Sequence, residues 1–337
     1  MENIAIVILN WNGVHHLKHF LPSVKSFSSE SSIYVIDNGS EDDSVSFLTK
    51  EHPDVQQIHL DKNYGFCQGY NLGLNKIDAR YYVILNSDVE ATKDWLVPLY
   101  KMMEEDESIA ACQPKIKSYN NKDYFEHAGA AGGYLDVLGY PFCKGRIFTT
   151  VEKDGGQYNA SSEIFWSSGA CMMIRSDIFH HLQGFDERFF AHMEEIDLCW
   201  RIKNSNFKIY YNAESTVYHL GGGTLHKSNP KKTYLNFRNG LLLLHKNLSF
   251  KRLLPVLFMR MILDGVAFVD FIFAGNPKDA FAILRAHLSF YRMLPGSVKK
   301  RKATQKVAKR SWHKGMSRKS IVWGYFIKKN KKYSNYF

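Results

Sequence analysis

Residues 4–13 read IAIVILNWNG, an unbroken apolar run followed at once by a polar loop. A strand that is apolar on both faces must be buried on both faces, which is typical of the parallel sheets of α/β proteins. Two later runs have the same form. Residues 33–36 (IYVI) lead into residues 37–40 (DNGS), and residues 81–85 (YYVIL) lead into residues 86–88 (NSD). The three runs predict buried strands that end in polar loops.

Helical patterns alternate with these strands. They cover residues 15–27, 44–50, 69–75 and 95–105, and two further strands are predicted at residues 55–60 and from residues 110–112. The alternation predicts a parallel α/β sheet with helices on both faces. Ligands of such sheets bind at the carboxyl ends of the strands, where the three polar loops lie. Residues 115–165 are rich in Gly, Tyr and Asn, and we expect long loops or short antiparallel strands there.

The composition excludes several classes of protein. The 337 residues are 45% hydrophobic and 23% charged, a balance that argues against a largely disordered chain. The five cysteines are scattered and form no CxxC pair, which fits a reducing compartment better than a disulfide framework or a zinc cage. The N-terminal sequence has no basic start and no small-residue cleavage site, so we expect no secretory signal.

The positive charge of the chain is concentrated at its C-terminus. The net charge is +11, yet residues 296–337 hold 14 Lys and Arg and no acid, which leaves 30 basic and 33 acidic residues elsewhere. Such a segment is a solvated tail, a contact for an anionic membrane surface, or a nucleic-acid contact. Because no RNA- or DNA-binding module is recognisable, we expect no nucleic-acid partner and favour the membrane surface.

Residues 253–274 form a long apolar stretch that could cross a bilayer. The stretch contains Arg260, Asp264 and Asp270, and each charge would cost about 2.5–3.5 kcal/mol near the centre of a spanning helix. On a helix the three charges share about one third of the circumference. The sequence therefore predicts an amphipathic helix that lies in an interface or packs on the domain, rather than a membrane span.

Several polar residues could carry chemistry, and each also has a structural interpretation. Asp88 follows a strand, where it could hold a divalent cation or cap the next helix. Glu194, Glu195 and Asp197 open a helix, where acids favour the helix dipole, but one of them could be a general base. His219 could be structural or could supply a nitrogen ligand to a metal. The residues alone leave these alternatives open.

Two turns could contribute to nucleotide binding. Asp37 lies in a turn signal, and its carboxylate could also accept a hydrogen bond from a nucleobase. Residues 63–66 and 69–73 are turns of small residues that enter a helix, where the backbone could approach a phosphate. Each is a weak signal when taken alone.

The order of these motifs along the chain is more specific than any one of them. The chain resembles the family 2 glycosyltransferases, which are inverting enzymes that use nucleotide sugars and have the GT-A fold. The matching stretches are IVILNWNG (6–13), VIDNGSEDDS (35–44), NYGFCQGYNLG (63–73), YVILNSDV (82–89), SSGACMMIR (167–175), GFDERFFAHMEEIDLCWRI (184–202) and VYHLGGGT (217–224). Residues 234–244 (YLNFRNGLLLL) resemble the rhamnosyltransferase-like subgroup.

The resemblance implies a fold and a division of the chain. The fold is an α/β GT-A domain, a Rossmann-like nucleotide-diphospho-sugar transferase, with a C-terminal helical extension. We expect the GT-A domain at residues 1–224, an amphipathic helical region at 225–295 and a basic tail at 296–337.

The resemblance also implies how the donor is bound. Asn10 and Asn12 match positions that line the nucleotide pocket, and Asp37 matches the acid that contacts the base. Gly65 and Asn71 lie in the stretch that helps to enclose the donor.

Asn86, Ser87 and Asp88 stand where the family has its D-x-D motif, and Asp88 with His219 would hold Mg²⁺ or Mn²⁺. Asn86 is a departure, because its amide replaces the first acid of that motif and leaves fewer carboxylates for the metal.

The catalytic base would be Glu195, which takes the place of the family's usual Asp, with Glu194 as the second candidate. Glutamate has one more methylene than aspartate, so this position is the second departure from the family's pattern.

The implied activity is transfer of a sugar from a UDP- or dTDP-linked donor, with dTDP-rhamnose as one candidate. The acceptor would be a hydroxyl of a glycan or of a lipid-linked saccharide in cell-surface polysaccharide assembly. The enzyme would be cytoplasmic and peripheral at the inner face of the cell membrane. Two alternatives are a non-catalytic nucleotide-sugar-binding protein with a degraded site, and a nucleotidyltransferase. The absence of a basic, Gly-rich loop near residue 10 counts against the nucleotidyltransferase.

Overall fold

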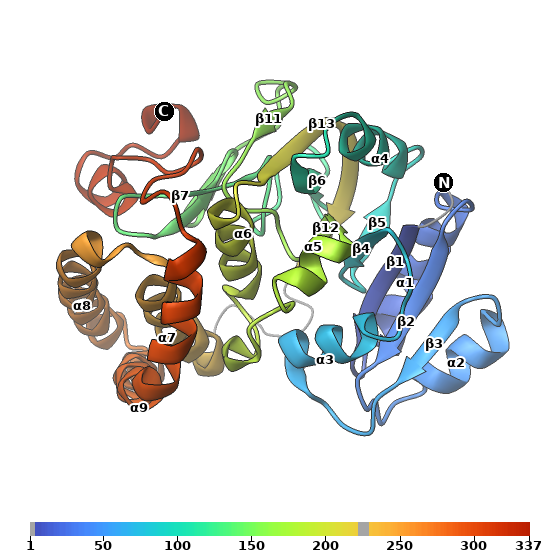
Figure 1. The fold of residues 1–337 in the computed structure, drawn as a ribbon, viewed down its shortest axis with the longest axis horizontal. Coiled ribbons are helices and arrows are strands. Elements are labelled where there is room, and N and C mark those ends of the chain that lie inside the picture. Colours follow the sequence, from blue (N-terminus) through green and yellow to red (C-terminus); the bar gives the residue numbers. More distant parts are fainter. Residues whose placement is uncertain (1–3, 222–228) are drawn as a thin grey trace.

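A nine-stranded mixed sheet forms the centre of the molecule in the computed structural model, which describes residues 4–221 and 229–337 (Figure 1). The strand order is β11-β13-β6-β12-β4-β1-β2-β3, and β5 pairs with β13 outside this path. The strands of this sheet are β1 (Ile4–Asn10), β2 (Ser32–Asp37), β3 (Gln56–His59), β4 (Tyr81–Leu85), β5 (Val89–Ala91), β6 (Ile109–Ser118), β11 (Ser162–Glu163), β12 (Cys171–Arg175) and β13 (Lys208–His219).

Helices cover both faces of this sheet and form a separate group at one end (Figure 1). The helices are α1 (Val14–Ser26), α2 (Ser44–Glu51), α3 (Gly65–Leu74), α4 (Leu96–Glu105), α5 (Ser176–His181), α6 (Glu194–Asn204), α7 (Pro230–Asn247), α8 (Phe250–Phe273) and α9 (Pro277–Val307). The described residues also form three short helical turns: η1 (Glu187–Phe189), η2 (Trp323–Ile327) and η3 (Tyr333–Asn335).

The first strands confirm the sequence prediction. Strands β3, β2, β1 and β4 are parallel neighbours. Ile4, Ile6 and Ile8 of β1 pack with α1, α2 and α4, whereas Ala5 and Val7 face the opposite core, which includes α3, α5 and α6. All five side chains are buried. The unbroken apolar run of β1 therefore reflects burial on both faces of the sheet.

Beyond β4 the sheet becomes mixed, although the predicted strand at residues 110–112 lies in β6, which runs in the same direction as β4. Strand β12 runs antiparallel to both β4 and β6, and β5 and β11 run antiparallel to β13. A parallel connection needs a crossover, usually a helix, but the chain reaches β12 from a segment of short strands and turns. Nothing in the local pattern of β12 marks this direction.

A second, four-stranded antiparallel sheet lies in the segment where short strands were expected. Its order is β10-β9-β8-β7, from strands β7 (Gly133–Leu135), β8 (Pro141–Cys143), β9 (Arg146–Ile147) and β10 (Thr150–Val151).

The C-terminal residues pack on this small sheet. The Ser317 N–H donates to the Leu135 carbonyl (2.7 Å), and Ile321 and Tyr336 are buried. The interpretation of this segment as a solvated tail is therefore wrong.

Helices α7, α8 and α9 form the C-terminal helical group, and α7 packs against α6 and α9. The predicted boundary at 224/225 lies outside the described residues. The predicted boundary at 295/296 falls inside α9, which continues to Val307. In the described part of the chain, no helix is both long and apolar enough to cross a membrane.

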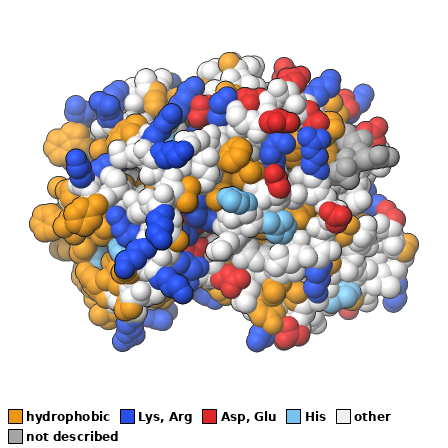
Figure 2. All heavy atoms as spheres, viewed as in Figure 1, with side chains coloured by type: hydrophobic (Ala, Val, Ile, Leu, Met, Phe, Trp, Pro, Cys, Tyr) orange, Lys and Arg blue, Asp and Glu red, His pale blue; other side chains and the backbone are white. Residues whose placement is uncertain are grey.

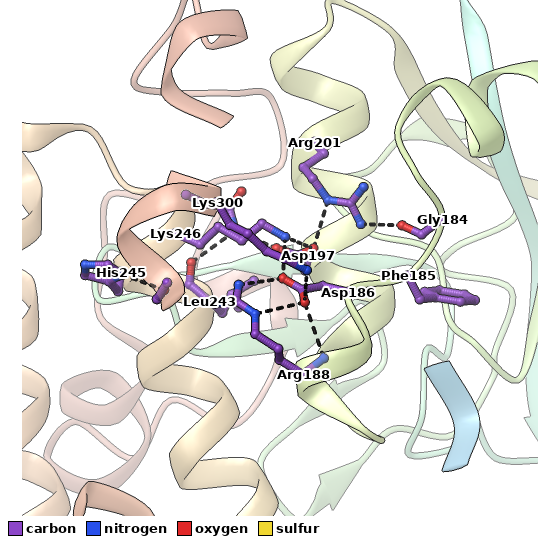
Figure 3. A network of polar contacts seen from close by, with 12 residues as sticks. Gly184, Phe185, Asp186, Arg188, Asp197, Arg201, Leu243, His245, Lys246 and Lys300 are labelled. Carbon is purple, nitrogen blue, oxygen red and sulfur yellow. Dashed lines mark hydrogen bonds and ion pairs between the residues drawn. The ribbon is translucent and has the colours of Figure 1, made fainter. Parts of the chain in front are cut away.

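A buried ion network joins this helical group to α6 (Figure 3). The Lys246 ammonium of α7 lies 2.9 Å from an Asp186 oxygen and 2.8 Å from an Asp197 oxygen, and all three side chains are buried. Lys300 of α9 adds a contact of 2.7 Å to Asp186, and Arg201 adds one of 2.9 Å to Asp197. Burial would raise the pKa of Asp197, but Lys246 and Arg201 outweigh it and lower that pKa. Both aspartates therefore stay charged inside the protein.

We expect Lys246→Met to lower the free energy of unfolding by about 3–5 kcal/mol, because it leaves two buried carboxylates without a shared cation. Urea denaturation measures this change. The matched control is Lys25→Met. The Lys25 ammonium lies 2.7 Å from the exposed Asp54 carboxylate, and loss of this pair should cost less than about 1 kcal/mol. Equal losses for the two variants would contradict a stabilising role of the network.

Candidate functional site

The carboxyl ends of β1 and β2 bring two predicted nucleotide-site residues together. Asn10 stands opposite Asp37 in the pairing of these strands, and both are buried. The Asn10 amide donates to Ser40 Oγ (3.2 Å), and the Ser40 N–H donates to Asp37 Oδ2 (3.1 Å). Asn10 Oδ1 has no hydrogen-bond partner among the described residues. A buried acceptor without a partner is costly unless a ligand or water satisfies it.

Asn12 holds the first loop to the second. Its backbone is left-handed, with φ of 50°. Its N–H donates to Ser40 Oγ (3.0 Å), and its Oδ1 accepts the Glu41 N–H (2.7 Å). Asn12 therefore fixes the shape of the loops that carry Asn10 and Asp37.

The loop after β1 also lies close to the loop after β4. A Cβ on Gly13 would stand 2.5 Å from Asn10 Oδ1 and 3.9 Å from Ser87 Oγ. Any side chain at this position would collide with Asn10. The glycine of the NWNG stretch thus leaves room for the Asn10 side chain within the loop after β1.

Asn38 is a connecting residue that sequence reasoning missed. Its Oδ1 accepts the Tyr64 N–H (3.0 Å), and its Nδ2 donates to the Gly65 carbonyl (3.1 Å). The only signal was its place in the DNGS turn. Asn38 therefore links the turn after β2 to the start of α3.

The start of α3 packs against the loop that precedes α6. Gly65 has φ of 75°, and a Cβ there would lie 2.5 Å from the Phe190 ring. The N–H groups of Phe66 and Cys67 both donate to the Phe190 carbonyl (3.0 and 3.2 Å). These two amides are therefore engaged within the protein and are not free to meet a phosphate.

Asn71 contacts the same region from the middle of α3. Its Nδ2 donates to the Phe185 carbonyl and its Oδ1 accepts the Phe185 N–H, both at 2.9 Å. Both polar atoms of the side chain are thus engaged with backbone, and Asn71 positions the segment before α6.

Asp88 and His219, predicted to hold a metal, lie side by side. Strand β5 pairs with β13, which places His219 opposite Val89. His219 Nε2 is 3.0 Å from Asp88 Oδ1 and 3.4 Å from the amide nitrogen of Asn86. Residues distant in sequence thus meet because of one short antiparallel pairing.

Glu126 is a second partner of His219 that the sequence did not reveal. Its Oε2 lies 3.2 Å from His219 Nδ1, and all three side chains of the Asp88–His219–Glu126 row are buried. Burial would lower the pKa of His219, but the two carboxylates outweigh it and raise that pKa to about 10. His219 is therefore an imidazolium between two carboxylates.

The residues present fit a divalent cation that is shared with a ligand. Asp88 offers a hard oxygen and His219 a nitrogen, while Glu126 lies on the far side of the imidazole. Within residues 4–221 and 229–337, no group of three His, Cys, Asp or Glu could hold a metal alone. A cation at Asp88 and His219 would therefore need further oxygens, such as those of a diphosphate, and the His219 proton would have to leave.

The loop before α6 is held in an unusual conformation. Phe190, His192 and Met193 all have positive φ, between 65° and 71°. Asn239 of α7 donates through Nδ2 to the carbonyls of Ala191 (2.8 Å) and His192 (2.7 Å). Strained backbone persists only where its surroundings hold it, and such strain gathers at functional sites. The sequence signal for Asn239 was its place in the YLNFRNG stretch.

Glu194 and Glu195 follow this loop at the start of α6. Burial raises the pKa of Glu195 to about 7, and burial together with the Glu195 charge raises the pKa of Glu194. Each has one carboxylate oxygen, Oε2, without a hydrogen-bond partner in the described chain. A carboxylate with a free oxygen and a pKa near neutrality suits proton transfer.

Glu195 lies near the end of β4. The Asn86 N–H donates to the Ala170 carbonyl (3.0 Å), and a Cβ on the preceding Gly169 would lie 3.9 Å from Glu195 Cβ. Asp197 lies apart from this contact, because Lys246 and Arg201 engage it in the ion network. Of the acids that open α6, Asp197 is structural.

We expect Asn239→Ala to lower the free energy of unfolding by about 1–3 kcal/mol, because it removes the donor from buried carbonyls. Amide hydrogen exchange at residues 190–193 should become faster. The matched control is Asn276→Ala. Asn276 is exposed, and among the described residues its side-chain amide donates only to the Ala274 carbonyl (3.3 Å). Unchanged exchange in Asn239→Ala would show that the loop holds its conformation without α7.

Similar known proteins identify the family and the fold of the chain. The family model "Glycosyl transferase family 2" matches residues 5–183. A low-salt glycan biosynthesis hexosyltransferase, Agl10, of Haloferax volcanii is 22% identical over 72% of this chain and 75% of its own. An N-acetylglucosaminyl-diphospho-decaprenol L-rhamnosyltransferase of Mycobacterium tuberculosis is 26% identical over 64% of this chain and 75% of its own.

A solved structure gives the same result for the fold. The structure of GalNAc-T7 with UDP, GalNAc and Mn²⁺ matches with a TM-score of 0.56 and 16% identity, over 73% of this chain and 48% of that chain. This likeness confirms the predicted GT-A fold, here with C-terminal helices α7, α8 and α9. Because the family model spans more than half of the sequence, the chain belongs to glycosyl transferase family 2, and a rhamnosyltransferase is among the relatives that it resembles.

Proposed function

We propose that this protein transfers a sugar, with inversion, from a nucleotide-diphospho-sugar to a hydroxyl of a glycan or of a lipid-linked saccharide. The observation that carries the proposal is the position of two buried pairs, Asn10 with Asp37 and Asp88 with His219, after strands β1, β2 and β4. Glu195 lies beside Gly169, close to the end of β4. UDP- and dTDP-linked donors both fit, since an acid that faces the base suits uracil and thymine alike. The likeness to a rhamnosyltransferase makes dTDP-rhamnose one candidate donor.

The donor would lie across the loops that follow β1, β2 and β4. Asp37 would accept an N–H of the base, and Asn10 and Asn12 would shape its pocket. Asp88 and His219, with Asn86 and Ser87 beside them, would hold Mg²⁺ or Mn²⁺ at the diphosphate. The likeness to a structure that contains UDP and Mn²⁺ supports this choice of ligand and metal. When bound, the cation would stabilise the charge of the leaving diphosphate.

Glu195 would act as the general base. Its carboxylate would accept the proton of the acceptor hydroxyl while the hydroxyl oxygen attacks the sugar from the face opposite the diphosphate. One displacement of this kind inverts the anomeric centre and forms no covalent intermediate. The strained loop of residues 190–193 and the contacts of Asn239 would keep the carboxylate in place.

We also propose that the enzyme is cytoplasmic and acts at the inner face of the cell membrane in cell-surface polysaccharide assembly. The excess of Lys and Arg in residues 296–337 supports attraction to an anionic membrane surface, without a nucleic-acid partner. A membrane position would bring the enzyme to a lipid-linked acceptor.

We expect Glu195→Gln to lower turnover by about 10²–10⁴-fold and to leave donor affinity unchanged, because an amide cannot accept the hydroxyl proton. For the unchanged enzyme, kcat/KM should fall as the pH drops below about 7, because protonation of Glu195 removes the base. Turnover of a nucleotide sugar, measured as a function of pH, tests the effects on the rate. Isothermal titration with the donor tests its affinity. Glu194→Gln is the matched variant and should retain more activity. Wild-type turnover in Glu195→Gln would exclude this residue as the base.

We expect EDTA to abolish turnover and Mn²⁺ or Mg²⁺ to restore it, because Asp88 and His219 alone are too few ligands for a stable site. Asp88→Asn should raise the metal concentration needed for half-maximal activity by about ten-fold or more. Asp123→Asn, at an exposed pair with Lys153, is the control. Full activity in EDTA would overturn the metal assignment while leaving the base assignment intact.

A further inference from the structure

Helix α8 presents an apolar stripe to its surroundings rather than to the protein. Phe258 is 65% exposed and Phe273 is 87% exposed. The exposed large apolar side chains recur mainly at intervals of three or four residues, which places them on one side of the helix. They are Phe250, Leu254, Phe258, Met259, Ile262, Val266, Val269, Ile272 and Phe273.

The central charges of α8 point the other way, into the protein. Arg260 and Asp264 are 4% and 1% exposed. The Arg260 guanidinium lies 3.7 Å from the centre of the Tyr140 ring, and Asp264 Oδ2 lies 3.0 Å from His287 Nε2. A helix that buries its charges and exposes its apolar side chains is inverted relative to a surface helix of a water-soluble domain. We therefore expect a binding partner to cover the exposed apolar stripe.

Helix α9 continues this surface. Its exposed apolar side chains Phe281, Leu284, Leu288 and Tyr291 also recur at intervals of three and four. The rings of Phe268 and Phe281 lie 6.5 Å apart, and Tyr291 Oη is 3.3 Å from Met261 Sδ, so the two helices run side by side. We call the exposed apolar side chains of α8 and α9 the α8–α9 face. Figure 2 shows hydrophobic side chains crowded on the side of the molecule where α8 lies.

Cations border the α8–α9 face. Lys251, Lys278, Arg285 and Arg292 are exposed on the same two helices. On these helices, which are described in full, Asp270 is the one exposed acid, because Asp264 is buried and Asp279 is partly buried and bonded to Thr233. Lys and Arg side chains also stand beside the hydrophobic cluster in Figure 2. An apolar surface with a cationic border is complementary to a bilayer with anionic headgroups.

We propose that the α8–α9 face docks on the surface of an anionic lipid bilayer. The apolar side chains would enter the boundary between headgroups and acyl chains, and the bordering cations would meet the headgroups, while neither helix crosses the membrane. A second copy of the chain is a poorer partner, because its face would bring cations against cations. The docking site is thus the folded pair of helices rather than the C-terminal basic segment alone.

Docking through this face would attach the membrane to a helical group that also contacts the surroundings of the candidate base. Helix α9 reaches Asp186 through Lys300, and α7 holds the loop before Glu194 through Asn239. The inference rests on the proposed function only in its choice of a lipid-linked acceptor as the reason for docking. Vesicle binding without donor or acceptor tests it separately from sugar transfer.

The experiment is co-sedimentation of the full chain with vesicles of phosphatidylcholine, with and without phosphatidylglycerol. The variant is Phe258→Ser/Ile262→Ser/Leu288→Ser, three exposed positions whose loss should leave the melting temperature unchanged. The matched control is Phe27→Ser/Tyr124→Ser, at exposed aromatic residues outside the face. We expect the wild type and the control to sediment with anionic vesicles, and the partition coefficient of the triple variant to fall about ten-fold or more.

Three outcomes would overturn the proposal. The first is equal sedimentation of the wild type and the triple variant. The second is no sedimentation of the wild type with anionic vesicles. The third is a wild-type dimer in sedimentation velocity that the triple variant abolishes, since that would make the face an interface between copies. If the triple variant loses vesicle binding but still transfers sugar to a water-soluble acceptor, docking is a property separate from catalysis.

Discussion

The Lys246 ammonium between Asp186 and Asp197 is the contact on which the arrangement of the site depends (Figure 3). Carboxylates are costly to bury, and they persist in the interior only when cations and hydrogen bonds compensate them. Here the compensation comes from three elements at once, because Arg201 lies on α6, Lys246 on α7 and Lys300 on α9. The network therefore determines where α6 stands relative to the C-terminal helices, and α6 carries Glu194 and Glu195.

This constraint makes the C-terminal helices part of the site rather than an addition to the GT-A domain. Asn239 of α7 holds the carbonyls of a loop whose left-handed residues would relax without such contacts. The same helical group exposes the α8–α9 face to its surroundings. One group of helices thus joins the candidate base to a surface suited to lipid.

The sequence predicted the parallel half of the sheet well, because each of β1, β2 and β4 is a local apolar run that ends in a polar loop. It also predicted that Asp88 and His219 could act together, but only through the resemblance to a family. The physical cause of their meeting is the β5–β13 pairing, and local patterns do not encode a long-range antiparallel pairing. Glu126 and Asn239 were missed for the same reason, since each acts on residues far away in sequence. The charges of α8 were recognised as one-sided, but only the structure reveals that Arg260 and Asp264 face inward while Asp270 is exposed.

The central claim is that this site transfers a sugar from a nucleotide-diphospho-sugar. The most direct measurement is release of nucleoside diphosphate by the purified full chain. The protein would be supplied in turn with UDP-, dTDP- and GDP-sugars, together with a mixture of saccharide acceptors and Mn²⁺ or Mg²⁺. A thermal-shift assay would run in parallel. The account predicts that a UDP- or dTDP-linked donor raises the melting temperature and releases nucleoside diphosphate only when metal is present. A thermal shift without release would favour a non-catalytic binding protein. Formation of pyrophosphate in a parallel reaction with a nucleoside triphosphate and a sugar 1-phosphate would favour a nucleotidyltransferase. Either result would contradict the account.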